Sequence, residues 1–133
     1  MAFFRRALVV VRGGGDLASG AIYRLHRAGF PVVVTELAAP LLVRRAVSFG
    51  EAVFSGTITI DGVTARLVDF ADAVQAVLDR GEIPTLIDAD GAALRVLEPV
   101  VVVDGRMEKR NLGTRMDDAP LVVALGPGFT AGI

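Results

Sequence analysis

The chain has 133 residues, 53% of them hydrophobic, a net charge of -1 and a mean hydropathy of +0.56. This length suits one domain and is too short for two. The balanced charges argue against a nucleic-acid-binding surface, and no apolar run is long enough to span a membrane. The absence of cysteine excludes disulfides and thiolate metal sites, and we expect a cytoplasmic protein without a secretory signal.

The first third of the sequence predicts a strand, a glycine turn, a helix and a second strand. The β-branched run Ala7–Val11 indicates a buried central strand, and the glycines 13–15 follow it directly. Asp16 can cap the next helix, which Gly29 ends. Pro31–Glu36 is the second strand, so the segment forms one complete β-loop-α-β unit.

In the middle of the chain the spacing of the apolar residues changes from a helical pattern to an alternating one and then back to a helical one. Pro40 suits the first turn of a second helix that runs to about Ser48. Alternation on both sides of an Asp-Gly turn then predicts a β-hairpin from Thr57–Ile60 and Val63–Leu67.

A third helix is predicted to open at Asp69 and Asp72 and to end at Gly81. One apolar stripe is expected on it, formed by Phe70, Val74, Val77 and Leu78.

Three further strands are predicted at Ile83–Asp88, Pro99–Asp104 and Pro120–Leu125. We therefore expect a single α/β domain over residues 1–133, with a Rossmann-like, mostly parallel sheet flanked by helices and an inserted β-hairpin. The last strand is followed by a glycine turn with no helix after it. This feature and the high apolar content predict a homo-oligomer or a chain that is truncated relative to its family.

The glycine turn carries the clearest chemical signal. Gly13, Gly15 and Ala18 fit the pattern G-x-G-x-x-A between a strand and a helix, where the backbone and the helix N-terminus can hold a phosphate. Glu36 ends the second strand, where an acid would accept hydrogen bonds from ribose hydroxyls. The predicted cofactor-binding residues of this region are Gly13, Gly14, Gly15, Asp16, Leu17 and Glu36. A glycine turn kept only for packing is the alternative.

Two later loops are expected at the same edge of the sheet. Arg106 and Lys109 could pair with a phosphate, and Gly126 and Gly128 form a second glycine turn after a strand. A solvated basic loop is an equally good interpretation of Arg106 and Lys109.

Other candidate sites are weaker. Residues 15–22 lack the lysine and hydroxyl of a P-loop, and the pair Asp88 and Asp90 before Gly91 favours a turn over a metal site. His26 is the single histidine and is expected on the surface. No metal site is predicted, and the sequence does not identify a catalytic group.

Three stretches together resemble a known family: Val9–Gly20, Val47–Gly56, and Val103–Thr114 with Leu125–Gly132. They are similar to the YqeB family, the selenium-dependent molybdenum hydroxylase system proteins, which are loosely akin to the XdhC/CoxI accessory proteins. The resemblance implies a role in maturation of molybdenum hydroxylases, with such an enzyme as partner, and family members about twice as long as this chain.

The expected function is therefore an accessory protein that binds a nucleotide or a nucleotide-bearing cofactor. The ligand would be an unknown nucleotide or dinucleotide, either NAD-like or a molybdenum-cofactor nucleotide. Two alternatives stay open: a nicotinamide-dependent oxidoreductase domain, and a regulatory module that senses a nucleotide.

Overall fold

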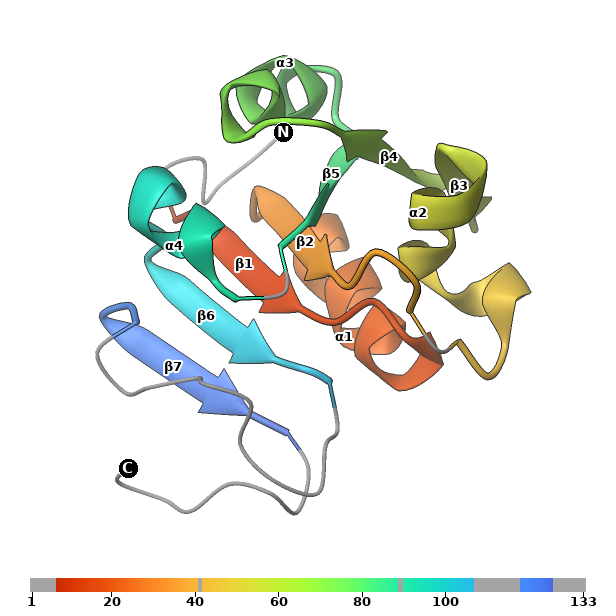
Figure 1. Ribbon diagram of the computed structural model, residues 1–133, viewed down its shortest axis with the longest axis horizontal. Coiled ribbons are helices and arrows are strands. Elements are labelled where there is room, and N and C mark those ends of the chain that lie inside the picture. Colours follow the sequence, from red (N-terminus) through yellow and green to blue (C-terminus); the bar gives the residue numbers. More distant parts are fainter. Residues whose placement is uncertain (1–6, 41, 89, 107–117, 126–133) are drawn as a thin grey trace.

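A computed structural model describes residues 7–40, 42–88, 90–106 and 118–125. In these residues one seven-stranded sheet has the order β3-β4-β5-β2-β1-β6-β7 (Figure 1). Its strands are β1 (Val9–Arg12), β2 (Val32–Glu36), β3 (Thr57–Ile60), β4 (Val63–Val68), β5 (Ile83–Ile87), β6 (Val101–Asp104) and β7 (Leu121–Ala124).

The sheet is parallel except at one edge. β1 lies at the centre and pairs in parallel with both β2 and β6, while β3 runs antiparallel to β4 with Ile60 opposite Val63. The chain moves outward from β1 in one direction to β2 and later in the other direction to β6. The α/β class and the mostly parallel sheet are thus confirmed.

Helices cover both faces of the sheet. On one face α1 (Asp16–Arg27) and α2 (Ala52–Ser55) pack over Val9, Val11 and Val34. On the other face α3 (Val74–Asp79) and α4 (Ala92–Leu97) pack over the alternate valines of the same strands. Burial on both faces explains why the central strands are continuous valine runs instead of alternating sequences.

Two predictions for the segments between strands were wrong. The described residues between Pro40 and Ser48 form no α-helix; short 3-10 turns at Arg45–Val47 and Phe49–Glu51 lead into α2 instead. The fully buried Phe49 anchors this segment, so a tertiary contact overrides the local helical pattern. Phe70 is 71% exposed, because the third helix begins only at Val74 after a 3-10 turn.

The helix α4 was not predicted at all. It follows Gly91, whose φ of +83° is a left-handed conformation that suits glycine. Asp88 accepts a hydrogen bond from the Ala93 N–H at 3.1 Å and Asp90 accepts one from the Ala92 N–H at 3.4 Å. Both carboxylates therefore accept hydrogen bonds from backbone N–H groups at the start of this helix.

The strand β7 forms one edge of the sheet and leaves apolar side chains uncovered. Leu121 is 54% exposed and Val123 is 39% exposed. This strip suits the predicted homo-oligomer, which stays a prediction. No helix in the described part of the chain is long and apolar enough to cross a membrane.

The contact between Gly105 and Ala18 gives a first testable prediction. A Cβ added at Gly105 would lie 2.8 Å from the Cβ of Ala18, so α1 and the end of β6 can approach only because both residues are small. Gly105→Ala should lower the free energy of unfolding by about 1–3 kcal/mol through overpacking.

Gly20→Ala is the matched control for this variant. No atom lies within 4 Å of its added Cβ on the exposed side of α1, so the change should raise stability by about 0.5–1 kcal/mol. Urea unfolding followed by circular dichroism measures both. Equal stability of Gly105→Ala and the wild type would contradict the close packing.

Candidate functional site

The candidate site is the loop between β1 and α1, at the carboxyl ends of the parallel strands. Gly13 has a φ of +96°, and its N–H donates to the Thr35 carbonyl at 2.7 Å. A Cβ at Gly13 would lie 2.8 Å from Cγ of Arg106. Glycine is therefore needed here both for the backbone turn and for the approach of the segment that follows β6.

Gly14 is covered by a second segment, which we name the strap and define as Ser48–Glu51. The N–H of Gly50 donates to the Gly14 carbonyl at 2.9 Å. A Cβ at Gly14 would lie 2.7 Å from the nitrogen of Gly50, so the two backbones are in direct contact. The middle glycine of the loop thus serves packing against the strap.

Ser19 fastens the strap to the first turns of α1. Its hydroxyl donates to the Gly14 carbonyl at 3.2 Å and accepts from the Phe49 N–H at 2.9 Å. Ser19 is 4% exposed and Phe49 is fully buried. Because the polar bonds and the apolar anchor act together, the strap is part of the folded core.

Gly15 differs from the two glycines before it. It precedes α1 with φ -68° and ψ 177°, an extended conformation open to any residue, and no atom lies within 4 Å of an added Cβ. Open space at the first turn of a twelve-residue helix is where backbone N–H groups can receive an anion.

Asp16 and Leu17 flank this open space. The Asp16 carboxylate accepts from the Leu17 N–H at 3.1 Å and pairs with Arg44 Nε at 2.9 Å. The side chain of Leu17 is 66% exposed. The carboxylate therefore already uses one donor of the helix N-terminus.

Glu36 is buried beside the glycine loop and is 8% exposed. Burial raises the pKa of its carboxyl group to about 7, while hydrogen bonds from the backbone amides of Gly14 and Leu37 oppose this increase. Its Oε2 lies 3.1 Å from the position of a Cβ on Gly50. The carboxyl group thus lies between loop and strap, and its predicted contact with a ribose stays a prediction.

Arg106 lies on the other side of the loop and is not a solvated surface cation. Its side chain is 11% exposed, and its Nη2 donates to Asp104 Oδ2 at 2.6 Å. Nε and the backbone N–H of Arg106 both donate to Asp104 Oδ1. The fully buried Asp104 therefore holds the guanidinium of Arg106, while Cγ of the same side chain lies against Gly13.

Sequence reasoning missed two buried charges at this edge. Arg12 ends β1 and is 3% exposed, and it lies opposite Asp104 of β6. Burial and then Arg106 lower the pKa of Arg12, whereas carboxylates, Asp104 first among them, raise it. The available signal was a charged residue at the last position of each valine strand.

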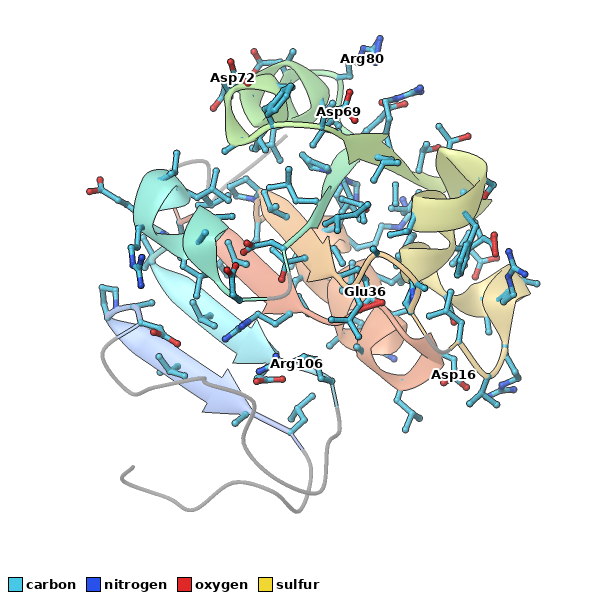
Figure 2. The ribbon with its side chains drawn as sticks, viewed as in Figure 1. Asp16, Glu36, Asp69, Asp72, Arg80 and Arg106 are labelled. Atoms are coloured by element: carbon cyan, nitrogen blue, oxygen red, sulfur yellow. The ribbon has the colours of Figure 1, made fainter. Side chains whose placement is uncertain are left out.

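Figure 2 shows the arrangement of the labelled groups. Asp16, Glu36 and Arg106 lie toward the carboxyl ends of the strands, whereas Asp69 and Asp72 lie around α3. The predicted residues Lys109, Gly126 and Gly128 fall outside the described residues.

One groove of the described residues lies at the amino ends of the parallel strands, opposite the glycine loop. It has a volume of about 910 Å³, and its walls include Leu8 and Pro31, which precede β1 and β2, together with Val96 of α4. His26 also lines it; the residue is half-buried, with Nε2 3.0 Å from the Gly81 carbonyl oxygen. The glycine loop contributes no residue to this groove.

The buried Glu36 predicts a pH dependence of stability. Its pKa rises from 4.5 to about 7 in the folded protein, so the folded state binds the proton more tightly than the unfolded state. The stabilisation is complete below pH 4.5 and is lost as the pH rises through 7, about 3 kcal/mol in total. Glu36→Gln should remove this decrease.

Urea unfolding between pH 5 and 8 measures the difference between wild type and variant. Glu98→Gln is the control, because Glu98 is exposed and this change should keep the wild-type profile. Parallel profiles of Glu36→Gln and wild type would contradict the raised pKa.

Comparison with known proteins gives one curated relative. No family model and no solved structure matches the chain. The uncharacterized protein YqeB of Escherichia coli (strain K12) is 49% identical over 125 residues, which make up 94% of this chain and 23% of that protein. The relative is thus longer than the twofold length expected from the resemblance. The chain is similar to less than a quarter of YqeB, and this similarity supports the predicted resemblance to the YqeB family.

Proposed function

We propose that this chain is a Rossmann-like domain that binds the phosphate of a nucleotide or nucleotide-bearing cofactor at Gly15. The glycine loop follows the central strand and opens the first helix, as in dinucleotide-binding folds. It also lies where the chain reverses its direction of winding, between β1 with β2 on one side and β6 on the other. Ligands of open α/β sheets bind at such a point.

The observation that carries this proposal is the contrast among the three glycines. Added Cβ atoms at Gly13 and Gly14 would collide with Arg106 and with the strap, whereas a Cβ at Gly15 would meet no atom of the protein. Packing therefore explains the first two glycines and leaves the third unexplained. Close approach of a ligand phosphate to the backbone supplies a reason for a glycine there.

The biological context proposed for this binding is maturation of molybdenum hydroxylases. It rests on the resemblance to the YqeB family, and the similarity to YqeB of Escherichia coli supports that resemblance. In this proposal the domain holds a nucleotide-like ligand for a longer protein that assists a molybdenum hydroxylase. The activity of the whole protein is part of the proposal.

Gly15→Val tests the proposal directly. The branched side chain would fill the space in front of the first turn of α1, so binding of any nucleotide that the wild type binds should be abolished. Calorimetry against nicotinamide, flavin, adenine, guanine and cytidine nucleotides measures the loss.

Two controls keep this test interpretable. Circular dichroism should show a folded Gly15→Val protein, because its backbone conformation is open to valine. Gly20→Ala on the same helix should bind as the wild type does. The proposal fails if the wild type binds none of these compounds at millimolar concentration, or if Gly15→Val binds equally well.

A further inference from the structure

We propose that the strap makes this site selective for ligands with a single nucleoside, by filling the place where the second nucleoside of a dinucleotide would lie. This inference rests on the proposed function and adds the class of ligand to it. The ligand we infer is a mononucleotide or another phosphate monoester of similar size. Its phosphate meets the backbone at Gly15, and no part of it reaches the Glu36 carboxyl group.

The first step of the argument concerns the end of β2. In dinucleotide-binding domains an acid at this position accepts hydrogen bonds from a ribose. Here the residue Glu36 is 8% exposed, and its carboxyl group is engaged by the backbone amides of Gly14 and Leu37. A ribose hydroxyl could reach it only after the strap has moved, because Gly50 lies against its Oε2.

The second step concerns the cost of moving the strap. Gly50 donates to the Gly14 carbonyl and Phe49 donates to Ser19 Oγ, and both bonds are buried. Opening would also expose the phenyl ring of Phe49, which is fully buried in the core under α1. The loss of two buried hydrogen bonds and of one large apolar side chain makes the closed strap the stable state.

The third step concerns Gly15 itself. No atom lies within 4 Å of a Cβ added at Gly15, whereas a Cβ added at Gly14 would lie 2.7 Å from the nitrogen of Gly50. A phosphate therefore has room at Gly15 beside the closed strap. The strap leaves this position open and closes the Glu36 side of the loop to a nucleoside.

Paired ligands test the inference. AMP, GMP and CMP are compared with NAD and FAD by calorimetry on the wild-type protein. We expect at least one mononucleotide to bind, and the dinucleotides to bind at least tenfold more weakly. NAD or FAD binding as tightly as the best mononucleotide would overturn the inference while leaving the proposed function intact. Absence of binding by all five would overturn both.

Hydrogen exchange gives an independent readout of the strap. The amides of Phe49 and Gly50 should stay protected when the mononucleotide binds, because the strap remains closed. Loss of their protection on binding would show that the ligand enters on the Glu36 side and would overturn the inference.

Ser19→Ala removes one fastening of the strap without filling the site. The dinucleotides should then gain at least threefold relative to the mononucleotide, whereas Gly20→Ala on the same helix should leave the ratio unchanged. If Ser19→Ala is folded by circular dichroism and keeps the wild-type ratio, the strap does not set the selectivity.

Discussion

The direct backbone contact between Gly14 and Gly50 is the constraint on which the candidate site depends. A side chain on Gly14 would collide with Gly50, and one on Gly50 would lie within 3.1 Å of the Gly14 carbonyl oxygen and the Glu36 carboxylate. Two glycines far apart in the sequence are thus required by one contact. This contact buries Glu36, fixes the strap over one side of the loop and leaves Gly15 as the open position.

The contact also explains which parts of the fold could be predicted from the sequence. The unit formed by β1, α1 and β2 was predictable, because an uninterrupted valine run, a glycine turn and a helical apolar period are local signals. The segment from Pro40 to Ser48 has a helical pattern as well. Its position is set instead by the buried Phe49 and by the hydrogen bond of Gly50 to the glycine loop, which follow it. A local pattern cannot reveal a partner that lies 36 residues earlier in the chain.

The candidate site also contains features that local sequence patterns predict and features that depend on distant contacts. Gly15 and Arg106 were identified because a glycine at a strand-to-helix turn and a basic residue after a strand are short-range motifs. Asp104 forms an ion pair with Arg106, and Arg12 is buried opposite Asp104. Both features depend on the parallel register of β1 and β6. Glu36 was identified by its distance from the glycines. The sequence spacing did not reveal that its carboxyl group faces the strap.

The electrostatics of this edge point to recognition by the backbone more than by side-chain charge. Arg106 is paired with Asp104, the pKa of Arg12 responds to several carboxylates, and the Asp16 carboxylate lies at the N-terminus of α1. The positive side chains here are compensated, and an ionised Glu36 would repel a second anion. With a pKa of about 7, Glu36 is partly protonated at neutral pH, which reduces this repulsion. An anion at Gly15 would therefore depend mainly on the N–H groups and partial positive charge of the first turn of α1, where geometry selects the ligand more strongly than net charge does.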